Sequence, residues 1–474
     1  MFTTRFPFSK AKSQSNDGEF DYNSFLVRLR NLDSTNIDLL SPLLDPRFDW
    51  NQWTMKNYEL ALNSINTIAL LAHEYTHFLD TTATTWGHEY TYRKLLILSE
   101  DNSDKLENRI NVLQLNISEI NNLHTDLIKT TSSNYNDLIS MNHYYKYSED
   151  HGSVVLIRLN YPNGKTDEIP VSMLAVNEGH AYCNETIYKF NLCKNIADQN
   201  LKQTLISIIN KDFDSFINQT IFSEYNILIK LSHIHFKNFF TNEEVLYLTS
   251  AILGFSLDCH DMLLTSFSYL LEQTISEKNF FVAQAITQDM RRGTSRHYLA
   301  FKLILIFYEI YNKGDKYQDI IKNIAKNQES KMNFDLVIKY LLDEDPTTSK
   351  SFSFMKEYFE KLVKEQEKDF KNEYIFKELS GNSKIYEEDN YVITDLNKYK
   401  LIDFLLNDDS IIKFNNRVDL DIEEYYLTDL NEKFSIINKA YDKIKKFHMD
   451  PYETEVTIQN LKNNYKEQPK QNTV

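Results

Sequence analysis

The sequence is poor in residues that make tight turns and covalent cross-links. Its 474 residues include only 9 glycines, 8 prolines and 3 cysteines. Because glycine and proline dominate β-turns, their scarcity argues against a turn-rich β-sandwich or barrel and favours a mainly helical fold. Three cysteines are an odd and sparse set, which argues against a disulfide framework and fits a reducing compartment. We therefore expect a cytoplasmic protein.

Long hydrophobic runs and an excess of basic charge are also missing. No apolar run approaches the roughly 18 residues that a membrane helix needs, and the first 20 residues lack the apolar centre of a signal peptide. The net charge is −16, and short basic clusters such as Lys443–Lys446 are flanked by acids. Nucleic-acid binding needs clustered lysine and arginine to neutralise phosphates. We expect neither a membrane nor a nucleic acid as a partner.

The sequence does contain the pentapeptide HEYTH at residues 73–77. Apolar residues recur at helical spacing over Thr54–Asp80, so this segment is predicted to be a helix. His73 and His77 then lie about one turn apart on one face, where both imidazoles can hold one Zn²⁺. Glu74 between them can act as general base for a water molecule at the metal. The structural alternative is a pair of partly buried histidines satisfied by backbone carbonyls.

A third ligand has to come from elsewhere in the chain, and Glu178 is the best candidate. It lies in a second predicted helix, which begins near Met173. Glu185, two turns later on the same face, is the rival ligand, and His180 is a weaker one. The alternative without a metal is a solvated glutamate near the start of a helix.

The surroundings of Glu178 make further predictions. A β-hairpin is predicted before this helix, with strands at 154–161 and 166–171 joined by a Pro-Asn-Gly-Lys turn. Gly179 follows the glutamate directly, although glycine inside a helix costs about 1 kcal/mol relative to alanine. We expect the missing side chain at Gly179 to let this helix approach the helix that carries the two histidines.

The HEYTH motif followed far downstream by Asn177-Glu178-x-x-Ala181 resembles the gluzincin branch of zinc metallopeptidases, to which thermolysin-like enzymes belong. In that branch an Asn-Glu-x-x-Ser/Ala helix supplies the third ligand. The resemblance implies zinc on His73, His77 and Glu178, with Glu74 as general base and then general acid. It covers only the two motifs, so kinship with thermolysin-like enzymes would be distant.

Two departures from the thermolysin-like pattern concern the surroundings of the ligands. Glu178 follows His77 by 101 residues, which is longer than in the compact members. The family also has an aspartate four positions after the third ligand, which orients the first histidine, and Tyr182 stands there in this chain. The candidates to hold a ligating imidazole in place of that aspartate are Asp80, Asn66 and Asn177.

Hydrolysis of a peptide bond also needs a hydrogen-bond donor for the oxyanion that forms at the carbonyl. The main candidates are Tyr182, His260 and His297, and the sequence does not rank them above Arg291, Arg292 or Tyr188. For His260 the alternative is a structural one, because Asp258–Asp261 also reads as a polar break between helices.

We expect a mainly α (α+β) protein with a zincin-like core, a small β-hairpin and a large helical region. The expected parts are a leader at 1–20 that is flexible or packed at an edge, a metal-binding core at 21–190, a helical region completing or covering the site at 191–345, a charged helical region at 346–466 and a disordered tail at 467–474. The expected function is an intracellular zinc metallopeptidase acting on a peptide or protein substrate. The alternatives are a non-catalytic helical scaffold with a degenerate zincin-like core, and a metal hydrolase acting on another bond.

Overall fold

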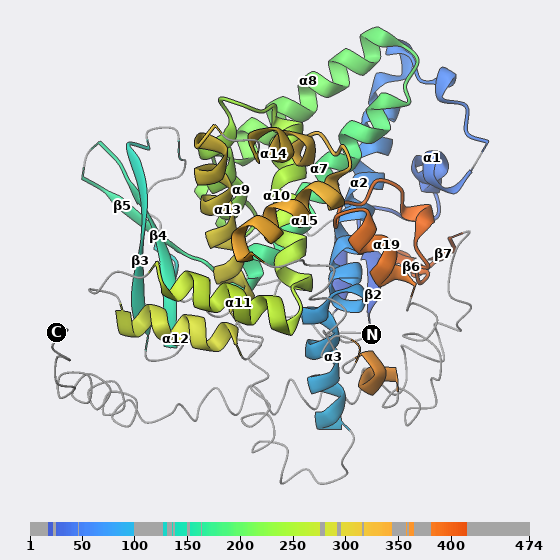
Figure 1. The fold of residues 1–474 in the computed structure, drawn as a ribbon. Helices are drawn as coiled ribbons and strands as arrows, with labels where there is room; N and C mark the ends of the chain where they lie inside the picture. Colours follow the sequence, from blue (N-terminus) through green and yellow to red (C-terminus); the bar gives the residue numbers. More distant parts are fainter. Residues whose placement is uncertain are drawn as a thin grey trace, which may run out of the picture.

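Helices dominate the fold, and they surround a central pair formed by α2 (Tyr58–Ala83) and α7 (Met173–Lys194) (Figure 1). The computed structural model describes residues 18–21, 25–45, 47–98, 127–129, 135, 138–148, 152–162, 164–274, 280–291, 295–314, 317–343, 357, 360–364 and 381–414. The prediction of a mainly helical protein with small sheets is confirmed. The predicted tail at 467–474 lies outside the described residues.

Helix α2 is buried along most of its length. A capping box at Thr54 opens a 3-10 turn at Met55–Asn57, and the α-helix continues from there. The hydroxyls of Thr76, Thr81 and Thr82 donate to carbonyls four residues earlier at 2.7–2.8 Å. These bonds satisfy the polar groups that burial removes from water, so α2 can run through the centre of the molecule.

Helix α7 begins at the cap residue Ser172, whose hydroxyl accepts from the backbone N–H of Ala175 at 3.1 Å. A Cβ added at Gly179 would lie 3.3 Å from the carbonyl oxygen of Tyr225 and 3.4 Å from the side chain of Leu253. These residues belong to α9 (Ser223–Phe236) and α10 (Asn242–Asp258). Gly179 therefore allows a close approach to α9 and α10, and the prediction that it faces the histidine helix is wrong.

The two ends of the described chain share one four-stranded sheet. Its order is β1 (Gly18–Asp21), β2 (Leu26–Leu29), β6 (Phe404–Leu406) and β7 (Ile411–Ile412), with β2 and β6 parallel and the other pairs antiparallel. The part of the predicted leader that is described, residues 18–20, thus forms an edge strand. Residues 404–412, which the sequence places in a C-terminal region, complete the sheet beside α2.

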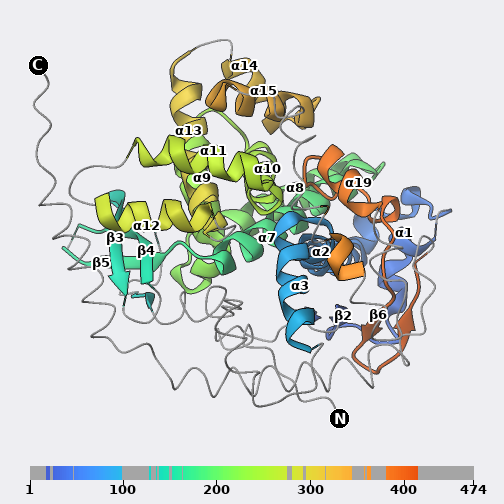
Figure 2. The ribbon, with the colours of Figure 1, turned by 60° about the horizontal axis from the view of Figure 1, so that its bottom comes forward.

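The second sheet contains the predicted hairpin. Strands β3 (Ser140–Ser148), β4 (Gly152–Asn160) and β5 (Thr166–Pro170) pair antiparallel in that order, and the β4–β5 turn contains Gly164 with φ of +73°. Figures 1 and 2 place the two sheets on opposite sides of the α2–α7 pair. The sheet that contains β1 packs against the part of α2 that carries the histidines.

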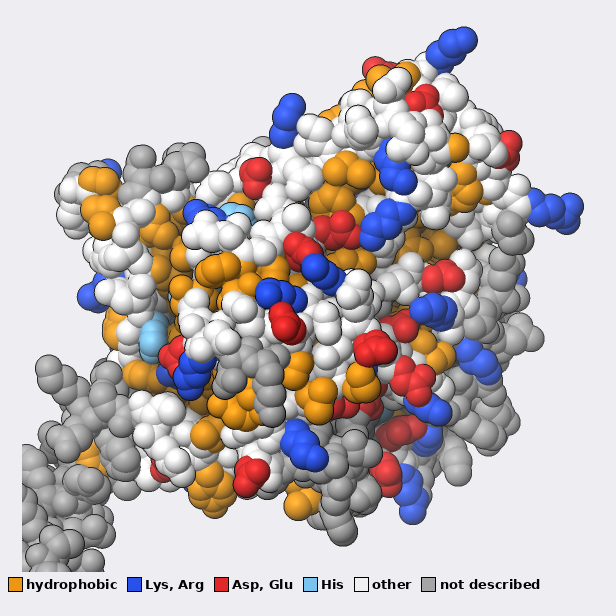
Figure 3. All heavy atoms as spheres, turned by 45° about the horizontal axis from the view of Figure 1, so that its top comes forward, with side chains coloured by type: hydrophobic (Ala, Val, Ile, Leu, Met, Phe, Trp, Pro, Cys, Tyr) orange, Lys and Arg blue, Asp and Glu red, His pale blue; other side chains and the backbone are white. Residues whose placement is uncertain are grey.

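Further α-helices complete the described part of the fold. They are α1 (Ser41–Leu44), α3 (Thr85–Leu98), α8 (Gln199–Phe216), α11 (Asp261–Glu272), α12 (Phe280–Met290), α13 (Arg296–Asn312), α14 (Tyr317–Ala325), α15 (Ser330–Leu342) and α19 (Asn382–Glu388). None of the described helices has the length and hydropathy needed to cross a bilayer. Acidic and basic side chains are interspersed over the face shown in Figure 3.

Residues 381–414 contact both α2 and α7 through buried polar groups. Tyr75 of α2 donates from its hydroxyl to the carbonyl of Ile402 at 2.6 Å. On α7, His180 lies 3.0 Å from the carbonyl oxygen of Tyr391, and Asn184 accepts from the backbone N–H of Ile393 at 2.8 Å. The positions of α2 and α7 therefore depend on a segment that follows the contacting residue of α2 by 327 residues and those of α7 by 209 and 211 residues.

Candidate metal centre

Three of the predicted residues meet where α2 and α7 are in contact. His73 and His77 stand four residues apart on α2, with ring centroids 5.0 Å apart. One carboxylate oxygen of Glu178 on α7 lies 3.5 Å from Nε2 of His73 and 3.4 Å from Nε2 of His77. The three side chains offer ligand atoms within 4.8 Å of one another, and all three residues are buried. They form a group that could hold a metal ion.

The spacing of these atoms fits a bound ion better than direct hydrogen bonds. Zinc binds nitrogen and oxygen ligands at about 2.0–2.2 Å, so two ligands of a tetrahedral ion lie about 3.3–3.6 Å apart. The separations of 3.4 and 3.5 Å fall in this range, whereas N–H···O hydrogen bonds cluster at about 2.7–3.2 Å. Two imidazoles and one carboxylate are also a donor set that zinc accepts in catalytic sites, with a fourth position left open.

The electrostatics of the group also favour a cation. Burial raises the pKa of Glu178, but the neighbouring His77 and His73 outweigh burial and lower that pKa to about 2. Burial lowers the pKa of His73, but Glu178 and Glu185 outweigh it and raise that pKa to about 10. The carboxylates therefore hold positive charge at this place, and a metal ion can take over that charge when the imidazoles are neutral.

Glu185 orients one of the histidines. Its carboxylate lies 3.1 Å from Nδ1 of His73, and its other oxygen accepts from Nζ of Lys189 at 2.8 Å. With Nδ1 held in this way, Nε2 of His73 is directed toward Glu178, which is the arrangement commonly found behind metal-binding histidines. Glu185 thus contacts the imidazole nitrogen that faces away from Glu178, and so it holds His73 in place. This differs from its predicted role as rival ligand.

The residues predicted to orient the histidines lie elsewhere. Asp80 accepts from the hydroxyl of Tyr386 at 3.0 Å and lies 3.0 Å from Nδ1 of His180. Asp80 therefore joins α2 to α7 and α19, and His180, with both nitrogens engaged, is not a metal ligand. Asn66 is exposed two turns before the motif, and Asn177 is buried with no hydrogen-bond partner for its amide among the described residues. No contact described for these three residues reaches His73 or His77.

The predicted oxyanion donors are scattered over other elements. Tyr182 stacks on Phe216 of α8 with ring centroids 3.8 Å apart. His260 caps the N-terminus of α11, as the polar-break alternative predicted. His297 is buried in α13, and burial lowers its pKa to about 4. No contact described for these three residues reaches the group formed by His73, His77 and Glu178.

Tyr225 on α9 is better placed. Its ring centroid lies 6.2 Å from that of His73, and the charge of Glu178 is the largest of the effects that raise its pKa. Tyr225 is only partly buried, unlike the ligand group. The sequence carries no motif at this position; the one available signal was Gly179, which lets the backbone of Tyr225 approach α7.

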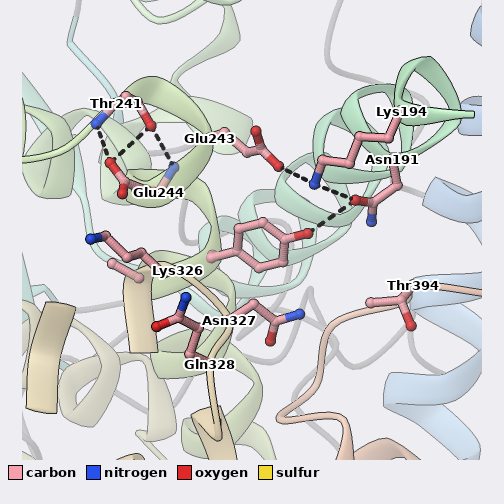
Figure 4. A pocket seen from close by; sticks show the side chains of 11 residues that line it. Asn191, Lys194, Thr241, Glu243, Glu244, Lys326, Asn327, Gln328 and Thr394 are labelled. Atoms are coloured by element: carbon pink, nitrogen blue, oxygen red, sulfur yellow. Dashed lines mark hydrogen bonds and ion pairs between the residues drawn. The ribbon is translucent and has the colours of Figure 1, made fainter. Parts of the chain in front are cut away.

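A surface pocket of about 480 Å³ lies apart from this centre (Figure 4). It is lined from α7 by Asn191 and Lys194, which stand 13 and 16 residues beyond Glu178 and hence roughly 20 Å or more along the helix. Its polar groups bind one another: Lys194 donates to Glu243 at 2.7 Å, and Tyr247 donates to Asn191 at 3.2 Å. The pocket is therefore not part of the metal centre.

Comparisons of the chain with protein-family models, with curated proteins and with solved structures gave no significant match. The resemblance to gluzincins rests on the two motifs and on the group that they form in the structure. What the fold establishes is a buried group of two histidines and a glutamate that could hold a metal ion.

Replacing Glu185 with glutamine should weaken zinc binding about 10- to 100-fold, because His73 loses the carboxylate that orients it. Zinc affinity measured by competition with a chelator tests this expectation. The matched variant is Asp80→Asn, which alters a carboxylate bonded to His180 and should leave zinc affinity unchanged. An equal loss of affinity in both variants would contradict the assignment of Glu185.

Proposed function

We propose that the protein is a zinc-dependent hydrolase that cleaves peptide bonds. The observation that carries this proposal is the buried group of His73, His77 and Glu178, with Glu74 next to the first histidine on the same helix. Zinc bound there would lower the pKa of a water molecule and polarise a carbonyl group. The resemblance of both motifs to those of gluzincins supports a peptide as substrate.

In this proposal Glu74 moves the proton. It follows His73 directly in α2 and is buried. Burial raises the pKa of Glu74 to about 7, although the charges of His73 and His77 act to lower it, and a carboxyl with a pKa near neutrality suits both steps. From this place Glu74 accepts a proton from the attacking water and then donates it to the leaving amine. Lys189 and Glu185 act only through His73, whose ring they keep in one orientation.

Tyr225 is proposed as the donor to the oxyanion. Tyr225→Phe should therefore lower kcat about 100- to 1,000-fold, the usual cost of one oxyanion donor, and should leave the zinc content unchanged. Steady-state kinetics on a cleaved peptide provide the measurement. Tyr182→Phe is the matched control, since the Tyr182 ring stacks on Phe216 and should not act in the reaction. If Tyr182→Phe lost activity while Tyr225→Phe kept the wild-type kcat, the oxyanion donor would be Tyr182 and not Tyr225.

One observation favours the non-catalytic alternative. Strand β1 lies against the motif, with the ring of Phe20 stacked on that of His77 at a centroid distance of 6.4 Å. His73, Glu74, His77 and Glu178 are each no more than 7 % exposed. A scaffold protein could keep such a covered group as a structural metal site. A hydrolase acting on another bond would use the same residues.

The test of the proposed function begins with the metal content of purified protein, measured by mass spectrometry. Zinc-loaded and chelated protein are then incubated with a proteome-derived peptide library, and newly formed peptide termini are identified. About one zinc per chain, with cleavage that the chelator abolishes and zinc restores, would support a metallopeptidase. Bound zinc without any cleavage would favour the scaffold alternative. Protein that binds no zinc would refute the proposal.

A further inference from the structure

Strand β1 crosses directly over the carboxylate of Glu74 at Gly18. A Cβ added at Gly18 would lie 2.5 Å from Oε1 of Glu74 and 3.0 Å from its Cγ and Cδ. Such separations are well inside the roughly 3.5–4.0 Å at which non-bonded carbon atoms are in favourable contact. Any side chain at position 18 would thus clash with the Glu74 carboxylate.

Space, and not backbone conformation, is what requires glycine here. Among the described glycines, positive φ angles occur at Gly164 and Gly314, whereas Gly18 adopts a strand conformation open to any residue. Glycine in a strand also weakens it, because it contributes no side chain to packing. With only nine glycines in the whole chain, one placed in this strand over Glu74 needs a local reason. The carboxylate supplies that reason.

The strand is held firmly in place beside Glu74. Gly18 pairs with Leu29 and Phe20 pairs with Val27 in the antiparallel β1–β2 ladder, and both β2 residues are fully buried. Phe20 stands two residues after Gly18, hence on the same face of β1, and it packs on His77. If a side chain were added at Gly18, the anchored strand would stay and the flexible end of Glu74 would move.

We propose that Gly18 is a positioning residue for Glu74, keeping clear the volume that its carboxylate occupies. This inference rests on the proposed hydrolase function. All three of the nearest atoms around the added Cβ belong to Glu74, and none belongs to His73, His77 or Glu178. Gly18→Ala should therefore displace the proton-accepting group and leave the metal ligands undisturbed.

Acetohydroxamic acid tests this without knowledge of the substrate. On binding to a metal ion it gives up its hydroxyl proton, and Glu74 is the group placed to accept that proton. Its affinity for cobalt-substituted protein, followed by the visible absorption of Co²⁺, therefore reports where the Glu74 carboxylate lies. The proteins compared are the wild type, Gly18→Ala, Glu74→Gln and the double variant. Gly381→Ala is the matched control, because a Cβ added there meets no atom within 4 Å.

The proposal expects Gly18→Ala to bind one cobalt as the wild type does, unfold at the same temperature and bind acetohydroxamic acid at least about 10-fold more weakly. Glu74→Gln should also bind the acid weakly. Adding Gly18→Ala to Glu74→Gln should cause no further loss, since Gly18 acts only through the carboxylate. Gly381→Ala should match the wild type.

The proposal would be overturned if Gly18→Ala bound acetohydroxamic acid as tightly as the wild type does. It would also be overturned if Gly18→Ala weakened this binding as much in the Glu74→Gln variant as in the wild type. Failure of Gly18→Ala to fold would also overturn it, because the strand and not the carboxylate would then have moved. The proposed function fails on different readings. Those are a wild type that binds no metal, or a Glu74→Gln variant that binds the acid as tightly as the wild type.

Discussion

Glu178→Ala is expected to strip zinc from the protein. Both His73 and His77 direct Nε2 toward one oxygen of Glu178, so the substitution leaves only two imidazoles for the ion. The affinity should fall by more than the roughly 100-fold that marks the loss of an orienting residue alone. Metal content after dialysis and chelator competition both measure this effect. Hydrolysis should be lost together with the zinc.

Glu224→Ala is the matched control for that variant. Glu224 is as buried as Glu178, at 7 % exposure, and it lies nearby on α9 but offers no atom to the histidine group. The control should keep its zinc. If Glu178→Ala retained full zinc while Glu185→Ala lost it, the third ligand would be Glu185, and the arrangement described for His73 would have to be reversed.

Glu74→Gln is expected to keep zinc and to lose hydrolysis. The amide has nearly the shape of the carboxylate but cannot accept a proton from water, so rates should fall about 100- to 10,000-fold, the contribution of a positioned acid–base group. The measurement combines the metal content with initial rates on a peptide found by the library screen. Retained zinc separates this variant from Glu178→Ala, in which both properties should disappear.

The control for Glu74→Gln is Glu89→Gln. Glu89 also follows a histidine, lies in the partial repeat HEYTY at residues 88–92 and is 7 % exposed. Nε2 of His88, however, lies 2.7 Å from the carbonyl oxygen of Thr82, which makes His88 a structural histidine. Glu89→Gln should keep both zinc and activity. An unchanged rate in Glu74→Gln would favour a different base or the non-catalytic scaffold.

The features that could be predicted from the sequence are those that local geometry decides. The helix period places His73 and His77 on one face wherever that helix lies, and α2 was predicted to within a few residues at each end. The hairpin before α7 followed from alternating apolar residues around a Pro-Asn-Gly turn. Thr241 and Glu244 form the capping box that opens α10, and this Thr-x-x-Glu pattern is likewise local in the sequence. Each of these signals comes from residues that are close together along the chain, so no tertiary contact was needed.

The features that could not be predicted depend on which face of one element meets another. Asp80 was expected to hold a ligating histidine, but its face of α2 meets His180 and Tyr386. Glu185 took that role because it lies two turns beyond Glu178 on the side of α7 that meets His73. The sequence does not distinguish these outcomes, because the helical spacing of Asp80 on α2 and of Glu185 on α7 would allow either carboxylate to reach a histidine.

The sequence by itself determined a mainly helical protein, two histidines on one helical face and a glutamate motif suited to complete a metal group. Tertiary structure alone decided that Glu178 meets those histidines across 101 residues, that Tyr225 stands beside them and that Gly18 lies over Glu74. The physical reason is the range of the forces involved. Helix periodicity acts over one or two turns, whereas these contacts arise from burying large apolar faces, which is non-directional and leaves no short motif.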